Sequence, residues 1–341
     1  MLADITRMKT FVYHDGALGD VLLSLPCIRR LKACSGSVYV AGRGDVVRFL
    51  KDVGLADAAS SSDQSLFSSM HSALDHRLRT FLCGFDQACV FTAQEHSAVA
   101  AAIRHAIPRS RTIRTIPPDD SQMHAAQYRF SQLEPARLRL PDEYAVLSLP
   151  PQKAETARSL LREGGYNPEA GLIAVHPGSG GRQKCWPLER YFELIERLQP
   201  VNEAFVIVFT GDAEAGELKK AVCRYARGRK NIIHASDLDL MSAASILSNC
   251  DLYIGNDSGF SHLASLLGFT TIVLFGPTDP SLWRPLGHRV EVVSTDTLGP
   301  MTQITVDEVI EKIELAITGN RPKHERLFPP PRQPHASAAV V

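Results

Sequence analysis

The sequence has no apolar run of about 18 residues or more, so it contains no candidate for a helix that crosses a membrane. It also has no excess charge, because 37 lysine and arginine residues balance 37 aspartate and glutamate residues. A formal net charge of zero gives no general electrostatic reason to bind nucleic acid, and we expect no nucleic-acid partner. With 44% hydrophobic and 22% charged residues, the composition is that of a globular protein.

Paired cysteines are missing as well. The seven cysteines are odd in number and include no Cys-x-x-Cys pair, which argues against a disulfide framework and against a zinc site. Small apolar core residues in a reducing compartment are the better interpretation. The first residues also lack the apolar core of a signal peptide. We therefore expect a cytoplasmic protein without a structural metal.

What the sequence has in quantity is alternation of short apolar runs with helical patterns, in two halves. A chain of 341 residues is long enough for two domains, each with its own core. The alternation predicts an α/β protein with two doubly wound domains that face each other across a cleft. We place them at residues 1–150 and 151–318, with a hinge at Pro150-Pro151. A serine-rich segment, 60–72, is expected to be a mobile loop, and the proline-rich tail 319–341 to be disordered.

One stretch, 249–280, reads as strand, tight turn, helix and strand. Its turn contains Asp257 and Ser258, either of which can cap the following helix. The first-turn amides of such a helix point toward the carboxyl end of the strand, where a phosphate is favoured. An ordinary capped crossover helix explains the same pattern, with Asp257 and His262 doing nothing chemical.

A second loop of interest follows the first expected strand and contains Gly16 and Gly19. Asp20 comes where a helix begins, since the next apolar residues recur at helical spacing. It is either a helix-end carboxylate that stabilises the dipole or a carboxylate poised as a base.

Two further loops carry polar residues suited to a nucleotide. The loop 176–187 is rich in glycine, which allows a close approach to an anion, and Lys184 can reach a diphosphate from its far side. Glu214 follows another apolar strand and is placed either to bind a ribose hydroxyl or to begin a helix.

Four arginines cluster before residue 115: Arg104, Arg109, Arg111 and Arg114. They form either a solvated loop or a site for an anionic substrate, since arginine suits bidentate phosphate or carboxylate contacts.

Taken together, four motifs in this order and spacing resemble glycosyltransferase family 9, the ADP-heptose:lipopolysaccharide heptosyltransferases. They are GALGDVLLSLP (16–26), HPGSGGRQKCWP (176–187), TGDAEAGEL (210–218) and GNDSGFSHLASLLG through FGPTDP (255–280). The resemblance implies the GT-B fold, with Rossmann-like domains for the acceptor (N-terminal) and for the nucleotide-sugar (C-terminal). It also implies that the last helix, 305–318, packs back on the N-terminal domain.

The resemblance also implies roles for matched residues. Asp20 would be the general base and Lys184 the catalytic contact to the donor phosphates. The implied donor-binding residues are Ser179, Gly180, Lys184, Glu214, Asp257, Ser258, Gly259 and His262. The implied acceptor-binding residues are Arg104, Arg109, Arg111 and Arg114. Neither a metal nor a cofactor is expected beyond the nucleotide-sugar co-substrate.

The function implied is inverting, metal-independent transfer of a heptose from ADP-heptose to an inner-core sugar of lipopolysaccharide, at the cytoplasmic face of the inner membrane. The alternatives are another donor or acceptor, such as a protein or a different surface glycan, and a nucleotide-sugar-binding protein without catalysis. His14-Asp15 departs from the family pattern. Asp15 places a second carboxylate near Asp20, which could raise the pKa of Asp20 or compete for its role.

Overall fold

The computed structural model describes residues 8–70, 74–135, 140–141, 146–168, 170–202, 204–211, 214 and 216–318. The tail 319–341, predicted from composition to be disordered, lies outside the described residues, as do residues 71 and 72 of the serine-rich segment.

The first half of the chain forms a five-stranded parallel sheet in the order β3-β2-β1-β4-β5. Its strands are β1 (Lys9–His14), β2 (Ser37–Gly42), β3 (Ala58–Ser61), β4 (Gln87–Thr92) and β5 (Ser110–Arg114). Its helices are α1 (Leu18–Leu23), α2 (Leu25–Ala33), α3 (Gly44–Asp52), α4 (His76–Leu82), α5 (Ala98–Ala106) and α6 (Ala125–Leu133), with a 3₁₀ turn η2 (Ser65–Phe67).

The second half forms a six-stranded parallel sheet in the order β11-β10-β9-β6-β7-β8. Its strands are β6 (Leu172–His176), β7 (Phe205–Thr210), β8 (Ile232–Ser236), β9 (Leu252–Asn256), β10 (Thr270–Phe275) and β11 (Val290–Ser294). Its helices are α7 (Pro151–Glu163), α8 (Leu188–Asn202), α9 (Gly216–Ala226), α10 (Leu240–Leu247), α11 (Gly259–Leu266), α12 (Pro280–Trp283) and α13 (Val306–Thr318). Two 3₁₀ turns, η4 (Arg182–Lys184) and η5 (Met301–Gln303), interrupt its loops.

The central strands of the second sheet are almost entirely apolar. Every residue of β6, β7 and β10 is buried, because helices cover both faces of a parallel sheet. The predicted α/β architecture of two doubly wound, Rossmann-like domains in a GT-B type arrangement is confirmed.

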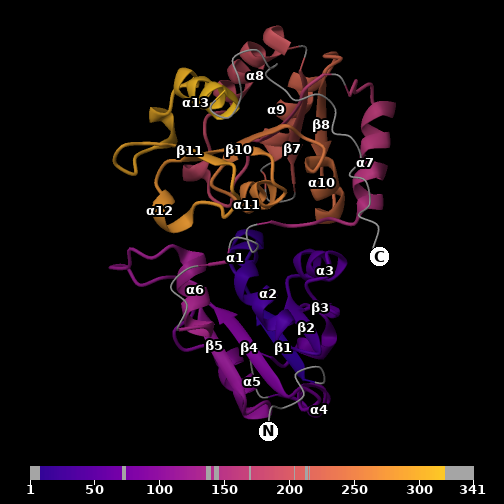
Figure 1. The fold of residues 1–341 in the computed structure, drawn as a ribbon, viewed down its shortest axis with the longest axis vertical. Helices are drawn as coiled ribbons and strands as arrows, with labels where there is room; N and C mark the ends of the chain where they lie inside the picture. The colour runs from indigo at the N-terminus through magenta and orange to yellow at the C-terminus, as the bar shows by residue number, and fades with distance from the viewer. Residues whose placement is uncertain are drawn as a thin grey trace, which may run out of the picture.

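The two domains face each other through the carboxyl ends of their strands, and α1 packs against α11 at the junction (Figure 1). Gly19 of α1 and Gly259 of α11 approach each other closely there. A Cβ added to Gly259 would lie 2.8 Å from the backbone nitrogen of Gly19, so the contact requires a glycine there. This approach places the start of α1 and the start of α11 side by side.

Two expectations about individual segments are wrong. Helix α13 contacts β10, β11 and α8 of its own domain, whereas the resemblance had placed it on the N-terminal domain (Figure 1). Its apolar face, with Val309 and Ile313 buried, covers the second sheet next to Trp186. This face is therefore not available to pack on the N-terminal domain. The serine-rich segment is structured up to residue 70, because Phe67 and Met70 are buried in the core between the sheet and α4.

Candidate active site

Each sheet has a point where the direction of the strand order reverses. In the first sheet it lies between β1 and β4, and in the second sheet between β9 and β6. In open parallel sheets, ligands bind outside the carboxyl ends of the strands at such a point. The loop after β1 leads to Asp20, whereas the loops after β9 and β6 carry Asp257 and Ser179. The topology therefore brings Asp20, Asp257 and Ser179 to the carboxyl ends of the strands, where the two domains meet.

Asp20 lies in the first turn of α1, with its side chain 39% exposed, and it makes no capping hydrogen bond. Its Oδ1 accepts a hydrogen bond of 2.9 Å from Nη2 of Arg129, which comes from α6 and is completely buried. Arg129 also donates to the carbonyl of Asp20, to Oγ of Ser24 (3.1 Å) and to the carbonyl of Thr115 (2.9 Å). The arginine thus fixes both the carboxylate and the turn that presents it. Sequence reasoning did not find Arg129.

His14 completes this network from the end of β1. The backbone N–H of Gly16 donates to its Nδ1 (3.1 Å), so Nε2 carries the proton and donates to Oγ of Ser24 (3.0 Å). The ring stacks on Phe91, with centroids 5.0 Å apart. Burial, with the positive charge of Arg129, lowers the pKa of His14 to about 3. His14 is therefore a neutral structural residue at neutral pH.

The pKa of His14 predicts an acid-sensitive fold. An unfolded histidine titrates near about 6.5. Because His14 binds no proton in the folded state until about pH 3, protonation of the unfolded chain should destabilise the protein as the pH falls below 6.5. The free energy of unfolding should fall by about 1.4 kcal/mol per pH unit from this residue.

His14→Gln should reduce that slope in denaturant titrations between pH 6.5 and 4, whereas His288→Gln, at an exposed position, should leave it unchanged. An unaltered slope in His14→Gln would contradict the assignment of a neutral His14.

Asp15, the second carboxylate of this loop, is held differently. Its Oδ2 accepts a hydrogen bond from Oγ1 of Thr92 (3.2 Å). Burial raises the pKa of Asp15, and the nearby negative charge of Asp20 raises it further, whereas the hydrogen bond from Thr92 lowers it. Asp20 has the arginine partner, and Asp15 does not replace it there.

On the other side of the junction, Ser258 caps α11 and accepts from the N–H of Ser261 (3.3 Å). Asp257 is left to bind other groups. Its Oδ2 accepts from Nζ of Lys184 (2.7 Å) and from Oγ1 of Thr278 (2.8 Å). Lys184 and Asp257 were singled out in motifs 73 residues apart, and the fold places them in one ion pair.

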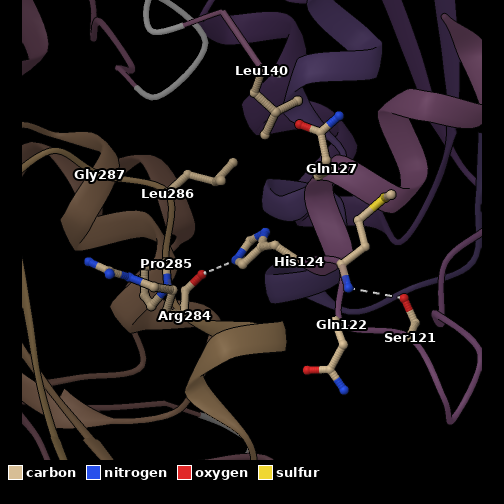
Figure 2. A pocket seen from close by; sticks show the side chains of 10 residues that line it. Ser121, Gln122, His124, Gln127, Leu140, Arg284, Pro285, Leu286 and Gly287 are labelled. Atoms are coloured by element: carbon tan, nitrogen blue, oxygen red, sulfur yellow. Dashed lines mark hydrogen bonds between the residues drawn. The ribbon is translucent and has the colours of Figure 1, made fainter. Parts of the chain in front are cut away.

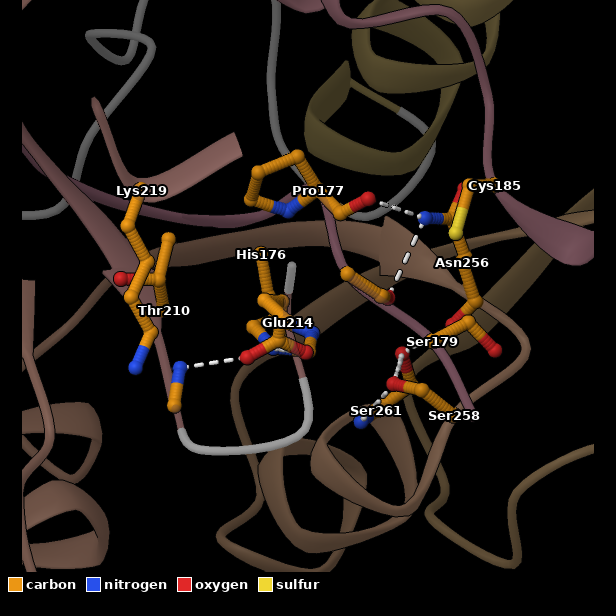
Figure 3. Close-up of polar contacts among 12 residues, drawn as sticks. His176, Pro177, Ser179, Cys185, Thr210, Glu214, Lys219, Asn256, Ser258 and Ser261 are labelled. Atoms are coloured by element: carbon orange, nitrogen blue, oxygen red, sulfur yellow. Dashed lines mark hydrogen bonds and ion pairs between the residues drawn. The ribbon is translucent and has the colours of Figure 1, made fainter. Parts of the chain in front are cut away.

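The glycine-rich loop after β6 is tied to the second sheet by Asn256, which is completely buried (Figure 3). Its Nδ2 donates to the carbonyls of Pro177 (2.8 Å) and Gly178 (3.2 Å), and its Oδ1 accepts from the N–H of Trp186 (3.0 Å). The hydroxyl of Ser179 donates to the carbonyl of Asp257 (2.7 Å). Asn256 is a further residue that sequence reasoning missed, although it stands next to Asp257.

Glu214 faces the same loop, but its side chain is only 5% exposed. His176 Nε2 lies 3.4 Å from its Oε1, and the N–H of Gly211 donates to its Oε2 (Figure 3). Burial alone would raise the pKa of Glu214, but the contacts with His176 and Gly211 leave it lowered. A Cβ on Gly178 would lie 2.1 Å from Oε1, so the loop approaches this carboxylate closely. Gly180, by contrast, has open space around it.

His262, on α11, is buried beside the junction, since a Cβ on Gly19 would lie 3.4 Å from its Cδ2. Burial lowers the pKa of His262 to about 4, although the nearby carboxylates of Asp257 and Asp20 act to raise it. A neutral imidazole therefore lies close enough to Asp257 and Asp20 for both charges to affect its pKa.

The arginine cluster is not assembled at this cleft. Arg114 ends β5 beside Thr92, at the carboxyl edge of the first sheet. Arg109 and Arg111 lie at the opposite, amino edge of the sheet, and Arg104 lies near the end of α5, where its Nη2 is 3.4 Å from Oγ1 of Thr112. The structure therefore separates three of the four arginines from Asp20.

A pocket of about 890 Å³ opens between the domains, with the start of α6 on one wall and residues 284–287 on the other (Figure 2). The N–H of Ala126 donates to Nδ1 of His124 (3.2 Å), so Nε2 of His124 donates to the carbonyl of Arg284 (2.8 Å) across the junction. Gln127, Leu140 and Leu286 also line the pocket.

Within the described ranges, no helix is long and apolar enough to cross a membrane. In the same part of the chain, no group of three or more His, Cys, Asp or Glu side chains is arranged to hold a metal ion.

Comparison with known proteins supplies the family. The model of glycosyltransferase family 9 (heptosyltransferase) matches residues 87–313. Lipooligosaccharide heptosyltransferase 2 of Haemophilus influenzae is 28% identical over 156 residues, covering 42% of each chain. The chain thus matches about two fifths of the length of this relative.

The solved structure of E. coli ADP-heptose lps heptosyltransferase II has the same fold, with a TM-score of 0.73 and 18% identity over 91% of this chain and 98% of that chain. E. coli heptosyltransferase WaaC with ADP aligns with a TM-score of 0.64 and 19% identity over 91% of this chain and 100% of that chain.

The family match extends over well more than half of the chain, and it includes the loop after β6, Lys184 and the start of α11. The protein therefore belongs to glycosyltransferase family 9, the heptosyltransferases.

Proposed function

We propose that this protein is an inverting, metal-independent glycosyltransferase that moves a heptose from ADP-heptose to an inner-core sugar of lipopolysaccharide. The observation that carries the proposal is that two ion pairs lie on opposite sides of one junction between the domains. Arg129–Asp20 lies on the N-terminal side and Lys184–Asp257 on the C-terminal side, with α1 and α11 in contact between them.

Asp20 is the proposed general base. Arg129 holds Oδ1, whereas Oδ2 accepts no hydrogen bond from the described residues and is free to take the proton of an acceptor hydroxyl. The oxygen of that hydroxyl attacks the anomeric carbon as the bond to the diphosphate breaks. A single base and one displacement give inversion at that carbon, without a carboxylate nucleophile.

The departing diphosphate is proposed to bind at the start of α11. Lys184 gives one N–H to Asp257, and an ammonium group has two more donors for phosphate oxygens. Ser179, Gly180, Ser258 and Gly259 are the further residues proposed to contact the donor. A fixed donor of this kind is worth about 3 kcal/mol in a transition state, so Lys184 and the helix amides can take the role that a metal has elsewhere.

The remaining assignments extend this proposal. The N-terminal domain would bind the acceptor and the C-terminal domain the nucleotide-sugar, with Glu214 near the ribose. Of the four arginines, Arg114 would contact the acceptor, because it lies beside Thr92 at the carboxyl end of the strands. Peripheral contact with the cytoplasmic face of the inner membrane would bring the enzyme to its acceptor. Another nucleotide-sugar or another glycan or protein acceptor would use the same chemistry.

Calorimetric titration with ADP-heptose, alongside UDP-, GDP- and dTDP-sugars, tests the donor. We expect selective binding of the ADP-linked sugar, and a product with inverted anomeric configuration when an inner-core acceptor is added. Selective binding of another nucleotide-sugar would retire the heptose assignment, and a product with retained configuration would exclude Asp20 as the base of a single displacement.

Lys184→Ala should weaken ADP binding by about tenfold or more, because a charge-assisted hydrogen bond to phosphate is worth roughly 1.5–3 kcal/mol. Calorimetry with ADP measures this directly. The matched control is Lys220→Ala, since Lys220 is exposed on α9 and pairs only with Glu217 among the described residues. Equal ADP affinity in Lys184→Ala and the control would show that Lys184 does not face the donor.

A further inference from the structure

We propose that the amino edge of the first sheet carries a second anion site, which binds a phosphate group remote from the cleft. The site is a pocket of about 400 Å³, and its lining includes Arg30, Arg109, Arg111, Cys34 and Glu134. It contains Arg109 and Arg111, two of the three arginines that the sequence singled out and that lie away from Asp20.

The pocket and the cleft are at opposite ends of the same strands. Its walls are the start of β4, the residues that lead into β5, the second half of α2 and the end of α6. β1 runs from this end to the junction with the second domain (Figure 1). Six residues of strand span about 20 Å, so a ligand here lies about that far from Asp20 and does not take part in sugar transfer.

The pocket has an excess of positive charge. Its acidic side chain, Glu134, is engaged by Nε of Arg30 at 2.6 Å. Arg111 donates from Nη1 to the carbonyls of Leu133 (2.6 Å) and Gln132 (3.4 Å), which neutralises the negative end of α6 but leaves its own charge without a counter-ion among the described residues.

Arg109 is the residue that distinguishes a ligand site from a structural cluster. It is exposed, and its guanidinium has no hydrogen-bond or ion-pair partner within the described residues. Arg111 orients one edge of its planar fork against α6, so its remaining N–H groups and those of Arg109 are available at the same pocket.

The chemistry of these groups selects a phosphate. Two guanidinium forks offer paired N–H donors that match the oxygens of a phosphate monoester, and a dianion balances their two charges. The apolar atoms of Leu31 and Cys34 line the same pocket and leave room for a small substituent. A lipid headgroup and a free phosphorylated metabolite share this chemistry.

The test is a calorimetric titration of the full chain with inorganic phosphate at constant ionic strength. Arg109→Gln should weaken phosphate binding by about tenfold, whereas the matched control Arg104→Gln should change it by less than about twofold, because Arg104 contacts Thr112 and does not line the pocket. Phosphate bound at the donor site contributes equally to all three proteins. Sugar transfer should be unchanged in Arg109→Gln, which separates this inference from the proposed function.

A second arm identifies the source of the phosphate. Co-sedimentation is measured with phosphatidylcholine vesicles that contain or lack phosphatidic acid. Loss of binding to phosphatidic acid vesicles in Arg109→Gln alone supports a lipid headgroup, and phosphate binding without vesicle binding supports a free phosphorylated compound. Equal weakening in Arg104→Gln, or no Arg109-dependent phosphate binding, would overturn the site.

Discussion

Replacing Asp20 by asparagine should lower kcat by about a hundredfold or more and leave the affinity for the donor within about twofold. Removal of a general base costs about 10²–10⁴ in rate. Asparagine has the size of aspartate and can still accept a hydrogen bond from Arg129, so the turn of α1 should keep its position. Steady-state transfer kinetics and donor calorimetry on the same preparation separate the chemical step from binding.

The control is Asp15→Asn, at the other carboxylate of the loop. Asp15 is held by Thr92 and lacks the contact with Arg129 that positions Asp20, so its replacement should change kcat far less than that of Asp20. If Asp15→Asn caused the larger loss, the base would be Asp15 and the assignment of Asp20 would be wrong. A similar kcat for Asp20→Asn and the unaltered protein would also contradict the assignment of Asp20 as the base.

Arg129→Met should have the largest effect on stability. The arginine is completely buried, and its removal takes one hydrogen bond each from the carbonyls of Asp20 and Thr115 and from the hydroxyl of Ser24. Breaking a buried ion pair from one side costs about 3–5 kcal/mol, and the partial exposure of Asp20 favours the lower end of that range. Urea unfolding should show a loss of about 3 kcal/mol.

Arg129→Lys gives a second readout. It keeps the positive charge but loses the planar fork, so stability should recover in part while kcat remains low, because the lysine cannot hold both the carboxylate and the turn of α1. The matched control is Arg48→Met, on the exposed face of α3, which should cost less than about 1 kcal/mol. Equal stabilities for Arg129→Met and Arg48→Met would refute the anchoring role of Arg129.

The sequence by itself predicted what local patterns control. The apolar runs of β6, β7 and β10 and the glycine and proline residues between them were enough to predict two doubly wound domains. The same local chemistry placed Asp20 at a helix start and left two candidates for the cap of α11. In the structure Ser258 caps the helix, and the carboxylate of Asp257 instead accepts hydrogen bonds from Lys184 and Thr278.

Tertiary structure decided the partners of those residues. Arg129 is 109 residues from Asp20, and no periodicity in the sequence connects them. Arg111 and Arg114 are close in the chain, yet Arg111 lies near the amino end of β5 and Arg114 at its carboxyl end, so they face opposite ends of the sheet. Local patterns fix which way a strand or helix runs, but contacts between distant segments depend on how the sheets are ordered. That order placed one set of charges at the cleft and the other at the far end of the first domain.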